Sequence, residues 1–186
     1  DRSVVYALLA GKKTISAVEK DNKKSWWKKI LLTHYYYFDI NKHILLNNLE
    51  PLNLLQIEHI NTLKSPEVSE KIVANIKEKL DRRGIKEFVI FHPSAQYKYK
   101  IYAQYLRDEL LSFLSKLGVS IVVTGTNNKI DTEIKLNLPS LPNIFDLIGE
   151  TSLEEYFALS SLSQAYIGMD TLNMHIASAQ NKRIFA

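Results

Sequence analysis

The chain has 186 residues, enough for one ordinary domain or for one domain with part of another. It is 46% hydrophobic and 24% charged, a composition that is typical of globular proteins and excludes a disordered chain. No apolar run approaches the roughly 20 residues that cross a bilayer, the first residues do not resemble a signal peptide, and there is no cysteine for a disulfide or a thiolate metal site. The net charge of +4 indicates an anionic partner such as a phosphorylated lipid, a nucleotide or a nucleic acid.

The first part of the chain predicts several short elements. Residues 4–9 fit a short buried strand or the end of a helix, and residues 14–18 alternate like a strand. Residues 20–29 fit a basic loop with two adjacent tryptophans, followed by a β-rich stretch over 30–38. Asn41 is the predicted N-cap of the next helix, whose apolar positions run from residue 44 to residue 55.

After a predicted linker at residues 59–66, helices and strands alternate regularly. A helix is predicted from Pro66 to Asp81, with the proline in its first turn and Gly84 at its end. Strands are predicted at 88–91, 119–124, 143–147, 166–169 and 182–186, and helices at 101–117, 129–136, from 152 onward and at 173–180. Ser152 and Glu155 have the spacing of a capping box. This order predicts a parallel sheet with helices on both faces.

The segment 165–179 carries the strongest indication of function. A short apolar run ends at Asp170, Thr171 follows at once, and His175 stands five residues after the aspartate, in a small-residue helix. Ligands bind at the carboxyl ends of strands in open α/β sheets, and a helix N-terminus offers N–H groups and a positive dipole end to an anion. We expect Asp170 to hold a sugar hydroxyl and Thr171, with the next amides, to hold phosphate. A capping role for Asp170 and core packing for His175 are the alternatives.

The pattern Asp-Thr-x-x-x-His-Ile-Ala-x-Ala in this segment resembles the signature Asp-Ser/Thr-Gly-x-x-His-Leu-Ala of glycosyltransferase family 9, the heptosyltransferases of the lipopolysaccharide inner core. Earlier segments resemble further family motifs in the same order: His92-Pro93-Ser94-Ala95 is similar to His-Pro-Gly-Ala, Lys100-Ile101-Tyr102 to Lys-x-Trp, residues 122–125 to a strand with a Gly-rich turn, and residues 147–155 to Leu-x-Gly-Lys-Thr-Ser-Leu-x-Glu. The resemblance covers residues 85–186 well and residues 1–60 loosely.

The resemblance implies an α/β fold of the GT-B type, built from Rossmann-like parallel sheets with helices on both faces. Residues 1–60 would be a partial N-terminal acceptor domain, 61–84 a linker and helix, and 85–186 a C-terminal nucleotide-sugar-binding domain truncated at its end. The implied reaction transfers a heptose from ADP-heptose to a lipopolysaccharide inner-core acceptor, with inversion and without metal or cofactor. The implied location is the cytoplasm, with peripheral contact at the inner-membrane surface.

The implied site residues fall into two sets. Those for the phosphates and sugar of the donor are Ser94, Ala95, Lys100, Asp170, Thr171, Leu172 and His175. Those for the nucleoside side are Gly125, Thr151 and Ser152. Lys100 matches the family's phosphate-binding lysine, with Lys98 and a merely solvated lysine as alternatives. The general base is expected in an N-terminal segment outside the chain, so the chain alone is expected to be inactive.

Two positions depart from the family's pattern. Leu172 stands where the family has glycine, and Lys129 where the family usually has a glutamate for the nucleoside; Asp131 or Glu133 are candidates to replace that glutamate, unless both are ordinary surface charges. These departures leave a catalytically silent nucleotide-sugar-binding protein as a second interpretation. A basic nucleic-acid-binding domain is a third, although the aromatic-basic signatures of RNA binders are absent, and we expect no nucleic-acid partner.

The tryptophan-lysine segment at residues 20–29 has two interpretations. Paired tryptophans among lysines favour an interface with anionic headgroups. Alternatively, the segment is a disordered surface loop whose tryptophans fold back on the domain.

Overall fold

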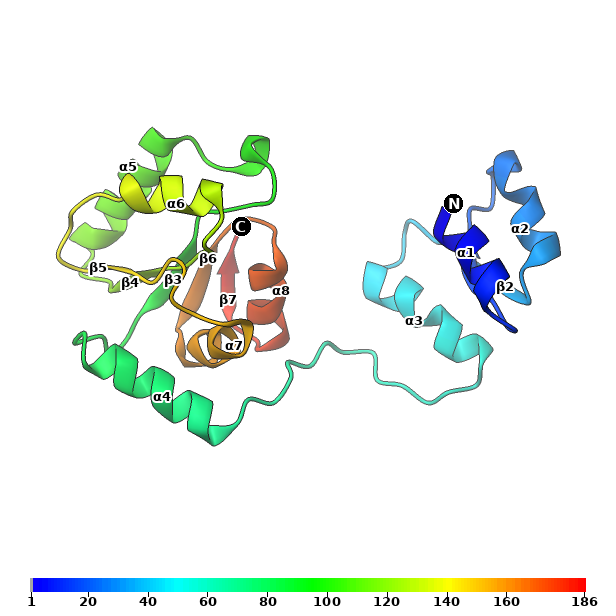
Figure 1. The fold of residues 1–186 in the computed structure, drawn as a ribbon, viewed down its shortest axis with the longest axis horizontal. Helices are drawn as coiled ribbons and strands as arrows, with labels where there is room; N and C mark the ends of the chain where they lie inside the picture. The colour runs from blue at the N-terminus through cyan, green and yellow to red at the C-terminus, as the bar shows by residue number, and fades with distance from the viewer. Residues whose placement is uncertain (1) are drawn as a thin grey trace. The chain divides into compact units, whose positions relative to one another are not determined.

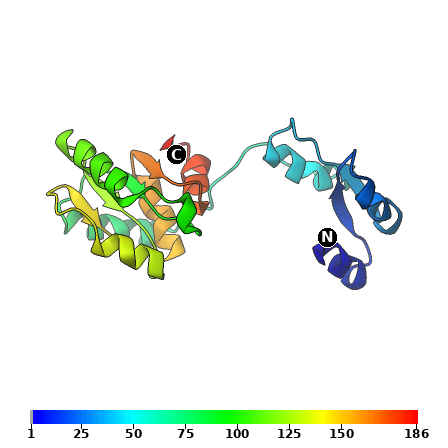
Figure 2. The same ribbon diagram turned by 90° about the horizontal axis from the view of Figure 1, so that it is seen from above.

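The computed structural model describes residues 2–186, which divide after Thr62 into two compact units (Figure 1). The first unit contains α1 (Arg2–Ala10), β1 (Ile15–Val18), the 3-10 helix η1 (Lys23–Ser25), α2 (Trp26–Leu31), β2 (His34–Tyr37) and α3 (Ile44–Leu54). Strands β1 and β2 pair in parallel, with Ile15 opposite His34. A parallel pair needs a crossover connection, and η1 and α2 provide it. Figure 2 shows α2 and α3 on either side of the strand pair. No helix within residues 2–186 is long and apolar enough to cross a membrane.

The first unit corrects several predictions. Residues 4–9 belong to the helix α1, so the helical alternative is confirmed and the buried strand is wrong; this helix has no buried residue. The predicted loop at residues 20–29 is confined to residues 20–22, because the side chain of Asn22 accepts the amide of Lys24 at 3.0 Å and a helical segment starts at Lys23. This segment continues through Leu31, so residues 30 and 31 are helical instead of β-rich. The N-cap of α3 is His43 and not Asn41, since His43 Nδ1 accepts the amide of Leu45 at 3.2 Å.

The second unit is an open α/β sheet. Its elements are α4 (Glu70–Asp81), β3 (Val89–His92), η2 (Lys98–Lys100), α5 (Gln104–Lys116), β4 (Ile121–Val123), α6 (Lys129–Leu136), β5 (Ile144–Asp146), α7 (Leu153–Leu162), β6 (Ala165–Gly168), α8 (Leu172–Ala179) and β7 (Arg183–Phe185). All strand pairs are parallel, in the order β5-β4-β3-β6-β7. The predicted parallel sheet is confirmed.

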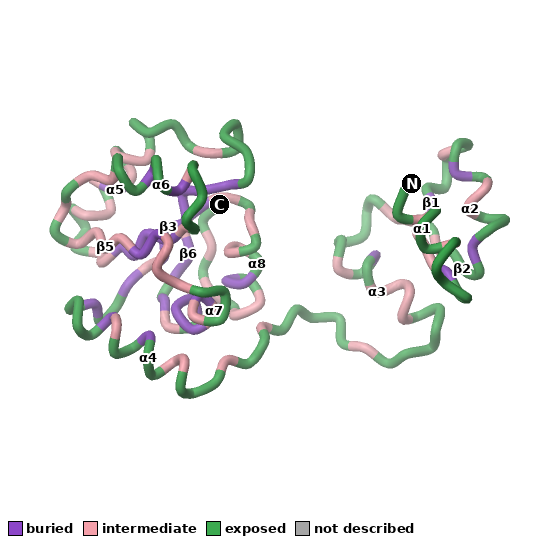
Figure 3. The backbone as a smooth tube through the Cα atoms, in the orientation of Figure 1, coloured by how far each residue is buried: buried purple, intermediate pink, exposed green. Residues whose placement is uncertain are grey.

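Helices cover both faces of this sheet, and side chains alternate between two cores. On β3 and β4, Ile90 and Val122 face a core formed with α4, α7 and α8. Their neighbours Phe91 and Val123 face a second core formed with α5 and α6. Figure 1 shows these helices on opposite sides of the sheet, and Figure 3 shows the buried residues concentrated along β3 and β6. Alternation of this kind is the period of two that a strand imposes on its side chains.

Two predicted helices begin later than expected. Helix α4 starts at Glu70 and not at Pro66, because Ser69 is the N-cap and its Oγ accepts the amide of Ile72 at 3.4 Å. Helix α5 starts at Gln104 instead of residue 101.

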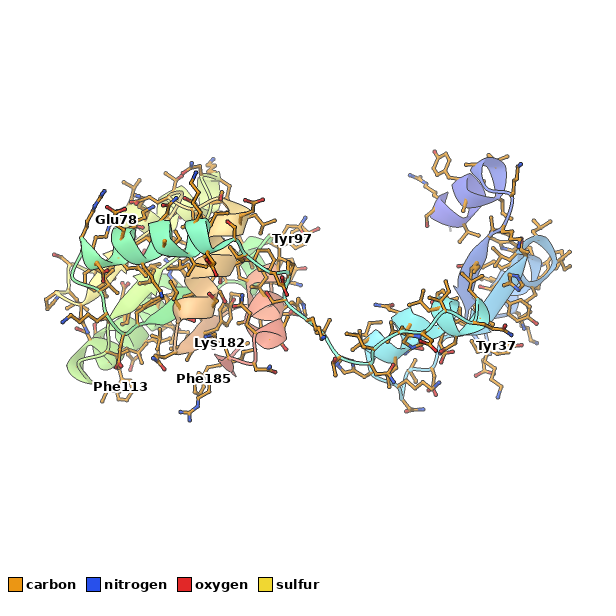
Figure 4. The ribbon with its side chains drawn as sticks, turned by 90° about the horizontal axis from the view of Figure 1, so that it is seen from below. Tyr37, Glu78, Tyr97, Phe113, Lys182 and Phe185 are labelled. Carbon is orange, nitrogen blue, oxygen red and sulfur yellow. The ribbon has the colours of Figure 1, made fainter. Side chains whose placement is uncertain are left out.

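At the other end of the unit, Lys182, labelled in Figure 4, donates from Nζ to the carbonyls of Ser161 and Ser163 at 2.7 and 2.8 Å. This contact gives hydrogen-bond donors to carbonyls at the end of α7, and the positive charge of Lys182 interacts favourably with the negative end of the helix dipole.

The strand order defines where a ligand is expected. From the central strand β3, the chain first adds strands on one side, β4 and β5, and then on the other, β6 and β7. The order therefore reverses between β3 and β6. In doubly wound sheets the crevice outside the carboxyl ends of the strands at such a reversal is the binding site.

Candidate functional site

A pocket of about 360 Å³ lies at this edge of the second unit. Its walls come from the segments that follow β3, β4, β5 and β6, so four consecutive strand ends contribute to one hollow. Seven of the predicted site residues line it: Ser94, Ala95, Gly125, Thr151, Ser152, Thr171 and Leu172. Lys100, Asp170 and His175 are not among the lining residues. The pocket thus joins residues 94–95, 125, 151–152 and 171–172, which are far apart in the sequence.

Strands β3 and β6 approach each other closely beneath the pocket. Gly168 lies opposite His92 in the register, and a Cβ at Gly168 would stand 2.3 Å from the carbonyl oxygen of His92. The hydroxyl of Tyr166 donates to the carbonyl of Met169 at 2.8 Å, just after the strand. Burial raises the pKa of Tyr166 to about 12, so the phenol keeps its proton for this bond. The loop that leads to Asp170 is therefore held against β3.

His92 is the buried centre of a polar network at the end of β3. Asn173 Nδ2, in the first turn of α8, donates to His92 Nδ1 at 2.9 Å, and Thr124 Oγ1 at the end of β4 lies 3.1 Å from the same nitrogen. Because Nδ1 accepts from the amide, the neutral ring carries its proton on Nε2. Burial lowers the pKa of His92 to about 4, against an opposing contribution from Asp131. This network ties the ends of β3, β4 and β6 together.

Asp131 is a buried carboxylate in the pocket wall, with 1% of its surface exposed. Its Oδ2 accepts from the amide of Thr126 at 2.6 Å, the hydroxyl of Thr126 at 2.9 Å and Nδ2 of Asn128 at 2.8 Å. Asp131 therefore organises the turn after Gly125 that faces the pocket. Glu133 instead is exposed and pairs with Lys98. Of the two candidates for the family's missing glutamate, only Asp131 lies at the pocket.

The N-terminus of α8 faces the pocket through Thr171, Leu172 and Asn173. Thr171 is the N-cap, and its side chain makes no capping hydrogen bond. The amides of Met174 and His175 bond to the carbonyl of Thr171, at 3.1 and 3.3 Å. The preceding amides, those of Leu172 and Asn173, have no partner within the helix and point out of its N-terminus. Asp170 and His175 are both exposed, and Asp170 Oδ1 lies 3.5 Å from His175 Nε2. The arrangement offers donors and a positive dipole end to an anion.

The two candidate lysines occupy different surroundings on η2. Lys98 Nζ is 3.1 Å from Glu133 Oε2, and its side chain lines a smaller hollow formed with α5 and α6. Lys100 is exposed and has no ion-pair partner among residues 2–186. Of the two, Lys100 is therefore the lysine that is available to a ligand.

The loop before α7 is fixed from two sides. Ser152 and Glu155 form the predicted capping box, with the amide of Glu155 on Ser152 Oγ at 3.2 Å and the amide of Ser152 on Glu155 Oε2 at 2.7 Å. From α4 and its end, Lys79 Nζ donates to the carbonyl of Glu150 at 2.6 Å, and Arg83 pairs with the Glu150 carboxylate at 2.6 Å. Thr151 and Ser152 are thus presented to the pocket by a rigid loop.

Sequence reasoning assigned no role to several residues at the site. His92, Gln96, Asn128, Tyr156 and Asn173 line the pocket beside the predicted residues. Burial raises the pKa of Tyr156, whose hydroxyl has no hydrogen-bond partner among the described residues. His92 was visible as the first residue of the His-Pro-Ser-Ala motif. Asn173 had no signal of its own, because its partner lies 81 residues away in the chain.

The second unit is a doubly wound α/β domain. Its pocket lies where the strand order reverses and offers hydrogen-bond donors to an anion. A model of glycosyltransferase family 9 (heptosyltransferase) matches residues 33–186. The chain belongs to this family, as the motifs predicted.

Known relatives agree with this membership. The chain is 27% identical over 141 residues to lipopolysaccharide heptosyltransferase 3 of Escherichia coli, a match that covers 73% of this chain and 40% of the relative. The fold is similar to the family 9 glycosyltransferase of Veillonella parvula DSM 2008, with a TM-score of 0.76, 16% identity, and coverage of 98% of this chain and 53% of the other. It is also similar to Escherichia coli heptosyltransferase WaaC with ADP, with a TM-score of 0.64, 12% identity, and coverage of 91% and 52%. These similarities confirm the predicted GT-B type fold. The chain spans less than half the length of the curated relative.

Proposed function

We propose that this protein is a heptosyltransferase that transfers a heptose from ADP-heptose to a lipopolysaccharide inner-core acceptor, with inversion and without metal or cofactor. The pocket of the second unit is proposed as the donor site. The observation that supports the proposal most is the convergence of four strand ends on one pocket, with the N-terminus of α8 among them. Escherichia coli heptosyltransferase WaaC, whose fold is similar, has been solved with ADP.

Each part of the pocket has a proposed role. The segment of Ser94 and Ala95, with Thr171 and the first amides of α8, would hold the diphosphate, and Lys100 would reach it as a point charge from η2. These donors would stabilise the negative charge of the departing nucleoside diphosphate, which is electrostatic catalysis. Asp170 and His175 would contact the sugar. Thr151, Ser152, Gly125 and Asp131 line the part of the pocket that would take the nucleoside.

Calorimetry on the full-length protein tests this assignment. Lys100→Ala should weaken the binding of ADP more than that of adenosine, because one charge-assisted hydrogen bond is worth about 1.5 to 3 kcal/mol. Lys116→Ala, which removes an exposed lysine at the end of α5, is the matched control and should leave both affinities unchanged. Equal losses for ADP and adenosine would remove Lys100 from the phosphate site.

A catalytically silent nucleotide-sugar-binding protein is the second candidate, and Leu172 favours it. Leu172 lines the pocket at the position where the family has glycine, and 58% of its surface is exposed. Its φ is not positive, and its side chain is not part of either core of the second unit. Leu172 therefore adds bulk beside the first amides of α8 without a packing role.

Leu172→Gly distinguishes the two candidates. The substitution should tighten ADP binding, because the backbone can then approach a phosphate more closely. It should cost at most about 1 kcal/mol of stability, because an exposed leucine at a helix start is replaced by glycine. Calorimetry with ADP beside a thermal melt measures both effects. The silent candidate would be favoured if the wild type binds the donor and neither the wild type nor Leu172→Gly transfers heptose.

The remaining parts of the proposal concern the surroundings of the enzyme. The acceptor is proposed to be the lipopolysaccharide core, and the protein is proposed to act in the cytoplasm, at the surface of the inner membrane. Transfer should be assayed on the full-length protein, because the chain spans less than half the length of the curated relative.

A further inference from the structure

Helix α2 of the first unit presents aromatic, apolar and basic side chains outward. Trp26, Lys29 and Ile30 are three and four residues apart, so they share one side of the helix. All three are exposed, Trp26 by 63% and Ile30 by 70% of their surface. The residues that flank the helix, Ser25 and Leu32, are buried. The helix is thus anchored at both ends, while its outer side has a tryptophan and an isoleucine that no other part of residues 2–186 covers.

Basic and aromatic residues extend this side beyond the helix. Lys29 Nζ lies 5.1 Å from the ring centroid of Tyr37 on β2, and Tyr37 meets Tyr35 edge-on at 5.8 Å. Tyr37, which Figure 4 labels, also lines a wide hollow together with Lys23 and Lys24 of η1. Lys23, Lys24, Trp26, Lys29, Ile30 and Tyr37 therefore form one continuous surface, the α2 surface.

The charge of this segment is strongly one-sided. Residues 20–29 contain five lysines and one aspartate. Among residues 2–186, no carboxylate lies within ion-pair distance of Lys23, Lys24 or Lys29. Three acidic residues, Glu19, Asp21 and Asp39, also line the hollow. Glu19 accepts a hydrogen bond from Asn22 Nδ2 at 2.7 Å, and Asp39 accepts the amide of Asn41 at 2.9 Å. Unpaired lysines around exposed aromatic and apolar groups match a surface that is anionic outside and apolar beneath.

We propose that the α2 surface docks the protein on the anionic phospholipid leaflet, with Trp26 and Ile30 at the level of the headgroups and Lys23, Lys24 and Lys29 on the lipid phosphates. Tryptophan and tyrosine prefer this interfacial layer, and each lysine near an anionic leaflet contributes about 1 kcal/mol. This inference rests on the proposed function, since an acceptor anchored in a membrane requires the enzyme at that surface. It adds the element and the side chains that make the contact.

Vesicle co-sedimentation of the full-length protein tests the docking. The probes are vesicles of phosphatidylglycerol and phosphatidylethanolamine in equal parts, with phosphatidylcholine vesicles for comparison. The double variant Lys23→Gln/Lys24→Gln should lower the partition coefficient on anionic vesicles about thirty-fold, at about fivefold for each lysine. Trp26→Ser should lower it about tenfold, and Trp26→Phe should keep most of the binding.

Matched variants in the second unit separate these effects from general loss of charge or apolar area. Lys71→Gln/Lys77→Gln removes two exposed lysines of α4, and Tyr105→Ser removes an exposed aromatic residue of α5. Both should bind anionic vesicles like the wild type. Thermal melts and ADP calorimetry on every variant should be unchanged, which shows that the first unit is folded and that the donor site is intact.

Three results would overturn the inference. The first is equal binding of the α2-surface variants and the matched variants to anionic vesicles. The second is wild-type binding to phosphatidylcholine that equals its binding to anionic vesicles. The third is binding of an RNA oligonucleotide that depends on the same lysines, together with no binding of the protein to vesicles. If vesicle binding fails while ADP affinity is normal, the docking surface is wrong and the proposed function stands. If the protein binds anionic vesicles as expected but does not bind ADP, the proposed donor site is wrong and the docking surface stands.

Discussion

At the scale of single residues, the contact between β3 and β6 leaves no room for a side chain at Gly168. A Cβ there would meet the carbonyl oxygen of His92 at 2.3 Å and its carbonyl carbon at 3.0 Å. Both atoms are backbone of a central strand, which cannot move without disturbing its pairing. We therefore expect Gly168→Ala to lower the free energy of unfolding by about 2 kcal/mol or more, as overpacking does. Urea denaturation measures the loss.

Gly84→Ala is the control for that experiment. Gly84 has a φ of +71° and nothing within 4 Å of the place where its Cβ would stand. Its substitution should cost only the backbone preference of an L-residue, about 1 kcal/mol. Equal losses for the two variants would mean that the close approach at Gly168 relaxes, and that His92 is not fixed by it.

His92 should make the stability of the protein depend on pH. Burial lowers the pKa of His92 to about 4 in the folded state, whereas an unfolded histidine has a pKa near 6.5. Between these values the unfolded chain binds a proton that the folded protein does not, so protonation favours unfolding. The contribution of His92 is fully present above about pH 6.5 and is lost as the pH falls toward about 4.

The variant His92→Asn isolates this contribution, since asparagine keeps hydrogen-bonding capacity at a similar position and does not titrate. From pH 7 to pH 5 the wild type should lose about 2 kcal/mol more than the variant does. Urea denaturation of both proteins at the two pH values measures the difference. Identical pH profiles would show that the ring of His92 is accessible to water in the folded protein.

At the scale of elements, the capping box of α7 should contribute to both stability and the site. Ser152→Ala removes the acceptor for the amide of Glu155 and should cost about 1 kcal/mol. Ser161→Ala, near the end of the same helix, is the control, because within residues 2–186 the Ser161 hydroxyl bonds only to the carbonyl of Ala158. A thermal melt of each variant gives the comparison, and a loss at Ser161 as large as that at Ser152 would contradict the capping role.

The elements also show what the sequence can predict. The strands predicted at residues 88–91 and 166–169 lie within one residue of the observed bounds. A short apolar run that ends at polar residues can be recognised as a strand from the local sequence alone. The start of α4 was misplaced, since Pro66 and Ser69 both favour a helix start and only Ser69 caps the helix. The basic segment 20–29 was interpreted as a loop, although lysine is a good helix former.

The site was predictable in its position and only partly in its members. The alternation of strands and helices indicates that residues 94–95, 125 and 171 follow strand ends, and those ends share one edge of a parallel sheet. The bond between Asn173 and His92 was not predictable, because it depends on the register of β3 and β6 across 81 residues. The burial of Asp131 and the exposure of Glu133 likewise follow from which side of α6 faces the sheet.

At the scale of the whole molecule, the chain divides after Thr62, and residues 57–69 contain no helix or strand. Lys64 in this stretch is exposed, while the next residue, Ser65, is fixed to the second unit because its Oγ accepts Gln180 Nε2 at 3.2 Å. Irregular exposed backbone opens easily and is cut first by proteases, whereas backbone in a packed sheet is protected. The second unit should therefore survive as a piece that begins at the residue after Lys64.

Limited trypsin digestion followed by mass spectrometry tests this division. The early product should begin at Ser65 and contain residues 65–186, and it should persist because most of the lysines and arginines beyond it lie on helices. Lys64→Gln should delay the appearance of this product without changing the melting temperature, since the exposed Lys64 side chain makes no hydrogen bond or ion pair among residues 2–186. Early cuts at Lys71 or Lys77 instead would show that α4 opens before the linker does. That result would contradict the assignment of α4 to the core of the second unit, where Ile76 and Leu80 are buried.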